Sequence, residues 1–477
     1  MALGFIQPLS EDEDLEDAGY EYFKYLVWRS FLDCESMDYL GKCWFTMHDL
    51  MHDLAYSVAG EEYCIVGLKT ENVNGRSRHV SFDAHLVSPL EIRNTLLRAT
   101  KVRSFAGNMN LPLFLQYYIA PIANCKYLRM LDLSGSNIKM LPHSTGNLKH
   151  LKALYLSNIK SLLKLPSSLP RLQLLETLDL DWCSSLRTLP SKTSRLVSLK
   201  HLQLEGCAEL DYMPRGLGKL TRLQKLSWFV VGRTTGEVRM KRSLNASNHT
   251  KSREAAGDRV SRKQDVKLHL PPLHQLYSLK VIQLSRLEAL ENVSETEMQE
   301  ELVSGKSTTI FFPSLEELQI DDCPNFKGWW KGDVGEASNP HLPCFPCLSH
   351  LTINHCPNLT TMPLFPSVTE LELKNTSSKP FQETMKLKLT KIEAPSSILD
   401  PRSRLEYLYI DEVKDLGSMS SLHQLYSLKV IRLSRLEALE NVSKIEMQEE
   451  LVSGKSTTIF FPSLEELQID DCPNLKG

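Results

Sequence analysis

The chain has 477 residues, and its 55 Lys and Arg nearly balance its 58 Asp and Glu, which leaves a net charge of −3. This balance gives no electrostatic reason for nucleic-acid binding by the chain as a whole. The start, MALGFIQPLSEDEDLED, is acidic and unlike a secretory leader, and the apolar run around LPLFLQYYIAPIA is too short to span a bilayer. Eleven cysteines without a leader indicate reduced thiols, so we expect a cytoplasmic location, with the nucleus as the alternative.

The first predicted elements are a helix, a strand and a second helix. Residues 15–32 carry apolar side chains at helical spacing behind an acidic start, which the helix dipole favours. A strand-like WFT leads into MHDLMHDLAYSVAG, where Leu50, Leu54 and Val58 share one helix face. This order predicts a small winged-helix-like α+β segment over residues 1–75.

From Leu128 the sequence repeats every 23 or 24 residues. The segments LRMLDLSGSNIKMLP, LKALYLSNIKSLLKLP, LETLDLDWCSSLRTLP and LKHLQLEGCAELDYMP share the leucine-rich-repeat pattern L-x-x-L-x-L-x-x-C/N, in which a strand and a return segment form one coil. One coil gains roughly 8–15 kcal/mol from its buried aliphatic side chains, whereas ordering its backbone costs at least ~24 kcal/mol, so the coils must stack. The predicted fold class is α/β, a leucine-rich-repeat solenoid (horseshoe) that follows the winged-helix-like segment.

The predicted repeats cover most of the chain. Entry repeats are expected over residues 76–127, regular repeats over 128–232 and irregular repeats over 268–477. The basic, polar segment 233–267 has too little apolar surface to fold, and is predicted to be a disordered linker or loop. The leading residues of the repeats are Leu128, Leu151, Leu175, Leu199, Leu223, Leu279, Leu315, Leu348, Val368, Leu405, Leu428 and Leu464.

A longer segment also occurs twice. Residues 273–328 return as residues 422–477 with four changes, which are Gln283/Arg432, Glu295/Lys444, Thr296/Ile445 and Phe326/Leu475. Drifted repeats share only their leucines, whereas these copies also share their surface residues. A recent segmental duplication, or an assembly error in the gene, explains this better than a functional constraint.

Two patterns in this sequence resemble metal sites. His48 and His52 lie on one helix face, but the general-base glutamate of metalloproteases and a third ligand are missing. Cys344 and Cys347 have ligand spacing without a second pair, so no metal is predicted. Other cysteines stand at the ninth repeat position, where a small buried residue is needed, and these are Cys183, Cys207, Cys323, Cys356 and Cys472.

The sequence SGKSTT occurs twice and is similar to the end of a phosphate loop. The full motif needs a glycine five residues before Gly-Lys, and Glu300 and Glu449 stand there instead. A carboxylate would repel a triphosphate at this position. We therefore expect no NTPase activity and no enzyme, although an NTPase is kept as an alternative function.

Outward side chains of the repeat strands form the predicted binding face, on the concave side of the solenoid. Tryptophan and tyrosine are enriched in protein hot spots, and the acidic side chains around them would steer a basic partner surface inward. The alternative is that the acids only solvate the array. The predicted partner-binding residues are Tyr155, Asp179, Asp181, Trp182, Gln203, Glu205, Tyr407 and Tyr409, and Glu316, Asp321, Asp322, His350 and His355 share the face.

Three segments carry a family resemblance. GFI at Gly4–Ile6, EDAGYEYFKYLVWRSF at Glu16–Phe31 and TMHDLMHDLA at Thr46–Ala55 resemble the last subdomain of the nucleotide-binding module in plant coiled-coil-type nucleotide-binding leucine-rich-repeat disease resistance proteins. The repeats, with their C-P-N-L endings, resemble the recognition domain of that class. The resemblance covers nearly the whole chain, although nothing in it matches the family's coiled coil or phosphate loop.

The resemblance implies a role for the first M-H-D. In the family, the counterparts of Met47, His48 and Asp49 close over bound ADP, with the histidine at the β-phosphate. Because the phosphate loop is absent, we expect these residues to be inactive and the chain to hold no cofactor.

The resemblance also implies protein partners, namely a pathogen effector, a guarded host protein or domains of another immune receptor. The predicted function is an intracellular plant innate immune receptor or a fragment of one. A non-functional truncated gene product is the alternative.

Overall fold

The structure is a computed structural model that contains two compact units, Met1–Leu210 and Asp211–Gly477. The predicted linker at 233–267 and both SGKSTT sequences lie outside the described residues. The structure describes residues 2–7, 15–37, 43–66, 73–82, 89–107, 120–229, 276–287, 290–294, 312–330, 345–362, 367–386, 404–418, 425–441 and 463–476.

The amino-terminal module consists of two helices and a hairpin. Its elements are α1 (Leu15–Trp28), β1 (Leu32–Met37), β2 (Cys43–Met47) and α2 (Asp49–Ala59), and β1 pairs with β2 in antiparallel fashion. The predicted helix, strand and helix are confirmed.

The first helix is shorter than predicted. Ser30 adopts the left-handed conformation with φ of 56°. The Phe31 N–H donates to the Leu26 carbonyl at 2.9 Å, which closes the helix end. Leu32 consequently begins β1 rather than ending α1.

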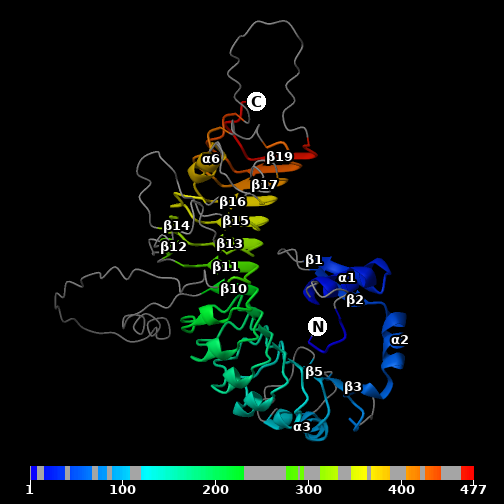
Figure 1. The fold of residues 1–477 in the computed structure, drawn as a ribbon. Coiled ribbons are helices and arrows are strands. Elements are labelled where there is room, and N and C mark those ends of the chain that lie inside the picture. Colours follow the sequence, from blue (N-terminus) through cyan, green and yellow to red (C-terminus); the bar gives the residue numbers. More distant parts are fainter. Residues whose placement is uncertain are drawn as a thin grey trace, which may run out of the picture. The chain divides into compact units, whose positions relative to one another are not determined.

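Seven parallel strands form the sheet of the first unit (Figure 1). Each predicted leading residue from Leu128 to Leu199 stands two residues before a strand, so these repeats are confirmed. The sheet begins at Tyr63, inside the predicted segment 1–75. Its strands are β3 (Tyr63–Val66), β4 (His79–Phe82), β5 (Ser104–Gly107), β6 (Met130–Asp132), β7 (Ala153–Tyr155), β8 (Thr177–Asp179) and β9 (His201–Gln203).

Among the described residues, the return segments of the first unit contain one α-helix and a series of short 3-10 helices. The α-helix is α3 (Pro89–Arg98), which lies between β4 and β5. The 3-10 helices follow the later strands. They are η2 (Ala120–Asn124), η3 (His143–Asn147), η4 (Leu169–Arg171) and η5 (Thr193–Arg195).

The second unit contains the remaining repeat strands, again parallel. The predicted leading residues from Leu223 to Leu464 are confirmed in the same way. A side sheet pairs β12 (Asn292–Ser294) with β14 (Gly328–Trp330), and α6 (Lys379–Lys386) follows β16. The repeat strands are β10 (Lys225–Phe229), β11 (Val281–Ser285), β13 (Glu317–Asp321), β15 (His350–Asn354), β16 (Glu370–Lys374), β17 (Tyr407–Asp411), β18 (Val430–Ser434) and β19 (Glu466–Asp470).

The core consists of stacked rows of repeat residues. Leu151, Leu154 and Leu156 are fully buried, as are their counterparts in the neighbouring coils. Each buried leucine contributes roughly 1.5–3 kcal/mol. The ninth-position thiols are also inside: Cys183 Sγ donates to the Leu156 carbonyl at 3.0 Å. Of the five predicted buried cysteines four are buried, and Cys472 is partly exposed.

The eighth residue of the repeats has a special backbone conformation. It adopts positive φ in Asn158, Trp182, Asp322 and Glu412, for example, and glycine stands there in other coils. This turn lets its N–H donate to the seventh carbonyl of the next coil, as from Asn158 to Asp181 at 2.7 Å. The hydrogen-bond ladder therefore continues past the end of each strand.

Candidate protein-binding face

The open sheet face is the side of the repeat strands that points away from the leucine core. It is formed by the third, fifth, seventh and eighth residues of each repeat. In β8, for example, Leu178 is buried, while Thr177 and Asp179 are half-buried on the other side. The predicted partner-binding residues all occupy these repeat positions.

Tyr155 lies in the middle of an acidic row in the first unit. Its register partners are Asp132 on β6 and Asp179 on β8, and Gln203 on β9 continues the row. Burial raises the pKa of Tyr155, and the charges of Asp179 and Asp132 raise it further. The phenol is therefore held neutral, as a hydrogen-bonding group with an apolar ring.

Trp182 is the large aromatic side chain of this region, and 45% of it is exposed. It has φ of 62°, and its indole ring lies against Gly206 of the next coil, so closely that a Cβ at Gly206 would be 2.7 Å from Trp182 Cε3. The indole ring can thus pack against Gly206 only because this residue has no side chain.

Asp181 was predicted to be an outward side chain of the binding face, but it is buried. Only 8% of it is exposed, and its Oδ1 accepts from the Glu205 N–H at 2.8 Å. The Asp181 N–H in turn donates to Asp179 Oδ1 at 3.0 Å. Asp181 therefore ties two coils together, whereas Glu205 is half-buried on the face.

Tyr407 and Tyr409 occupy the open sheet face of the second unit. Tyr407 pairs in register with Glu370, and Tyr409 pairs with Glu372 and Arg432. Burial raises the pKa of Tyr409, Glu370 raises it further and Arg432 opposes them. Tyr409 therefore lies between charged groups of opposite sign, whereas Tyr407 lies between Glu370 and Val430.

Asp411 is the centre of an ionic network beside the tyrosines. Its carboxylate receives Lys374 Nζ at 3.2 Å and Arg435 Nε at 2.8 Å. Burial alone would raise the pKa of Asp411, but the hydrogen bonds from Arg435 and Lys374 hold it below its ordinary value. Arg435 also pairs with Glu412 at 2.5 Å, so this network joins three successive repeats.

Histidines add two weaker ion pairs to the same face. His355 Nδ1 lies 3.5 Å from Asp321, and His350 Nε2 lies 3.5 Å from Glu370. These pairs are ionic only when the imidazole is protonated.

Met47, His48 and Asp49 lie at the junction of β2 and α2, and all three are exposed. His48 is the residue before α2, and its Nδ1 accepts from the Leu50 N–H at 3.3 Å. The imidazole therefore already caps the helix. The role of Met47, His48 and Asp49 at a nucleotide stays a prediction.

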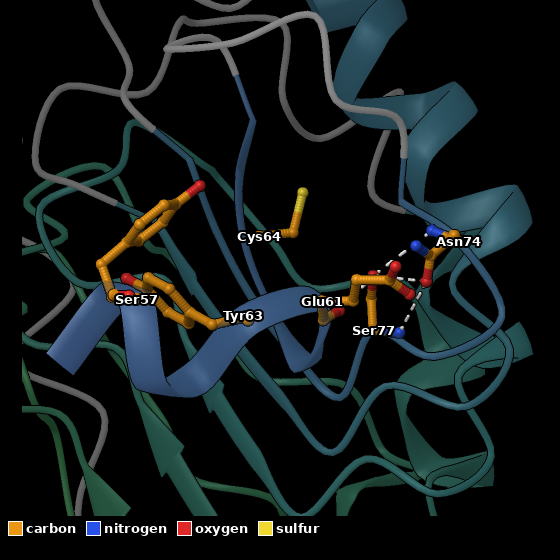
Figure 2. Close-up of a pocket in the computed structure, with 8 residues that line it drawn as sticks. Ser57, Glu61, Tyr63, Cys64, Asn74 and Ser77 are labelled. Atoms are coloured by element: carbon orange, nitrogen blue, oxygen red, sulfur yellow. Dashed lines mark hydrogen bonds between the residues drawn. The ribbon is translucent and has the colours of Figure 1, made fainter. Parts of the chain in front are cut away.

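A cavity that the sequence did not predict lies at the other end of α2. It has a volume of about 450 Å³ and is lined by Tyr56, Tyr63, Cys64, Asn74 and Ser77, among others. Figure 2 shows the side chains that line the cavity and the hydrogen bonds between Asn74 and Ser77, including the one from the Ser77 N–H to Asn74 Oδ1 at 3.1 Å. Asn74 Oδ1 also accepts from the Arg76 N–H at 2.8 Å. Asn74 and Ser77 are thus engaged in a local turn.

Among the described residues, no group of three or more His, Cys, Asp and Glu side chains is placed to hold a metal ion. Likewise, none of the helices in the described ranges combines the length and the apolar character that crossing a bilayer requires.

Sequence comparisons identify two known segments. Residues 101–377 match the leucine-rich repeat region family, and residues 1–55 match the disease resistance protein winged helix domain. The chain is 35% identical over 161 residues to a putative disease resistance protein, RGA1, of Solanum bulbocastanum, and 31% identical over 170 residues to another of Arabidopsis thaliana. These matches cover 33% and 34% of this chain but only 13% and 12% of those proteins.

Solved structures show similarity at low identity. A Leptospira interrogans leucine-rich-repeat protein is 15% identical, with 76% of this chain and 85% of that chain covered and a TM-score of 0.30. The LRIM1/APL1C complex is 16% identical, with 86% of this chain and 57% of that chain covered and a TM-score of 0.40.

Proposed function

Because the chain belongs to the leucine-rich-repeat family and has a disease resistance winged helix at its amino terminus, we propose that it is a recognition component of plant innate immunity. It binds a protein partner through the open sheet face and has no catalytic role. The partner is a pathogen effector, a guarded host protein or a domain of another receptor, met inside the cell.

The aromatic side chains of the open sheet face carry this proposal. Trp182 and the tyrosines Tyr155, Tyr407 and Tyr409 project from the open sheet face among charged groups, in both units. Aromatic side chains bury large areas at little entropic cost, and the surrounding charges orient the partner. Within each unit, a parallel sheet holds the tyrosines in rows.

The test compares the full chain with a variant that carries Tyr155→Ala, Trp182→Ala and Tyr407→Ala. Tyr426, which is 62% exposed and lies before β18 rather than on a strand, gives the matched control Tyr426→Ala. We expect proximity labelling in infected leaf tissue to identify a partner, and the purified partner to bind the wild type and the control at least tenfold more tightly than the triple variant.

Equal binding by the triple variant, at unchanged melting temperature, would exclude the open sheet face. Failure of the wild type to give a soluble, cooperatively melting protein would favour the alternative of a non-functional gene fragment. Binding of ATP or ADP in calorimetry would instead favour the NTPase.

A further inference from the structure

The strands β16 to β19 place aromatic and charged side chains in two adjacent rows. One row contains Glu370, Tyr407 and then Glu466 two strands further on, and the other contains Glu372, Tyr409 and Arg432. Neighbouring parallel strands are about 4.8 Å apart, so side chains in a row contact each other directly. Tyr409 therefore stands between Glu372 on one side and Arg432 on the other, whereas Tyr407 stands between Glu370 and Val430.

Tyr409 already has a cation on one side. The Arg432 guanidinium carbon lies 5.5 Å from the centre of the Tyr409 ring, and Arg432 pairs with Glu466 at 2.9 Å. A guanidinium over a phenol ring is attracted by the ring's negative face, and a carboxylate strengthens the arrangement. The chain's own residues thus show how this surface holds a guanidinium.

On the side of Tyr409 opposite Arg432 lie the carboxylates of Glu370 and Glu372, and the cations that could neutralise them are weaker. Glu370, with 41% of its side chain exposed, meets His350 at 3.5 Å, and that imidazole is neutral unless protonated. Glu372 is half-buried. Burial raises its pKa, Lys374 lowers it and Glu370 raises it again. Because Lys374 itself pairs with Asp411, this side has an excess of negative charge.

The duplicated segment supplies a natural comparison for Arg432. Its counterpart in the first copy is Gln283, whose Nε2 donates to Gln319 at 3.1 Å. The strands of the two copies pair in the same register, Val281 with Glu317 and Val430 with Glu466. Arg432→Gln therefore introduces a residue that the same following strand already accommodates, since Gln319 and Gln468 are equivalent.

We propose that Glu370, Glu372, Tyr407 and Tyr409 form a subsite for an arginine or lysine side chain of the partner protein. Arg432, on the other side of Tyr409, limits the affinity, because it repels a second cation and occupies Glu466. The subsite deepens the proposed function and rests on it. It gives the second unit a preference for basic partner segments.

The experiment measures fluorescence anisotropy of a labelled Gly-Ser peptide with two arginines, together with its citrulline counterpart, which has the same shape without the charge. The full chain is titrated at low salt, since exposed charges are screened at higher salt. We expect the arginine peptide to bind at least tenfold more tightly than the citrulline peptide. Glu370→Gln and Tyr409→Ala weaken arginine binding at least threefold, and Arg432→Gln strengthens it about threefold.

Glu440→Gln is the matched control, because Glu440 is a comparably exposed glutamate of the same unit that pairs with Lys476 outside the repeat strands. It leaves binding unchanged. Equal binding of the citrulline peptide, or weaker binding by Arg432→Gln, would overturn the subsite. If the cellular partner is lost with the triple variant but not with Glu370→Gln, the subsite fails while the proposed function stands.

Discussion

The contact between Trp182 and Gly206 allows a quantitative prediction for Gly206→Ala. Gly206 has φ of 71°, where alanine costs ~1–2 kcal/mol. The new Cβ would also be 2.7 Å from Cε3 and 2.8 Å from Cδ2 of Trp182, and relieving such overpacking costs ~1–3 kcal/mol. The substitution should therefore destabilise the first unit by about 2–5 kcal/mol.

The same geometry predicts that the two sites are coupled. In a Trp182→Ala background the ring contacts are gone, although Trp182 Cα, 3.2 Å from the new Cβ, remains. Gly206→Ala should then cost only ~1–2 kcal/mol, which gives a coupling energy of at least ~1 kcal/mol. Urea unfolding followed by far-UV circular dichroism measures all four proteins without relying on tryptophan fluorescence. Additive effects, within ~0.5 kcal/mol, would refute the assignment of the clash to the indole.

Three further predictions concern the core, a helix cap and the thiols. Leu178→Ala should cost ~2–5 kcal/mol in the same urea assay, because Leu178 is fully buried, and a cost below ~1 kcal/mol would contradict its place in the core. Burial alone would raise the pKa of Asp415, but hydrogen bonds from the Ser378 N–H and the Ser377 hydroxyl lower it below its ordinary value. The ionised carboxylate therefore stabilises the start of α6 above about pH 4, and this stabilisation is lost as the pH falls through the depressed folded-state pKa. Asp415→Asn should flatten that acid-side loss of amide-exchange protection, and an unchanged pH profile would argue against it. Burial raises the pKa of the Cys183 thiol to about 12, so at pH 8 iodoacetamide should label exposed Cys347 much faster than Cys183 in the native protein. Equal labelling rates, measured by mass spectrometry, would contradict the burial of the ninth-position thiols.

The positions of the repeat strands were predictable from sequence because the leucine spacing is local. A leucine followed by apolar residues three and five positions later must bury three side chains from one short strand, and Leu175, Leu178 and Leu180 do so. The cysteine at position nine followed from the same pattern. By contrast, β3 begins at Tyr63 with the sequence YCIV, which has no leading leucine, so the pattern could not place the start of the sheet.

The site was less predictable because its details depend on neighbouring coils. The outward placement of Trp182 and Tyr409 follows from repeat position. The burial of Asp181 depends on a backbone N–H at Glu205, in the next coil. The cation over Tyr409 likewise comes from Arg432, in a later repeat. The partner-binding role of the predicted residues remains a prediction.

The ladder bonds at the eighth position have a consequence for how such a chain changes over time. Every coil offers its neighbours the same backbone donors and acceptors, as in the bonds from Asn158 to Asp181 and from Glu412 to Ser434. A block of whole coils can therefore be inserted or lost by genetic exchange without leaving mismatched backbone groups at the junctions. Single substitutions in a copied block, such as arginine for glutamine, can then diversify the surface while the scaffold remains intact.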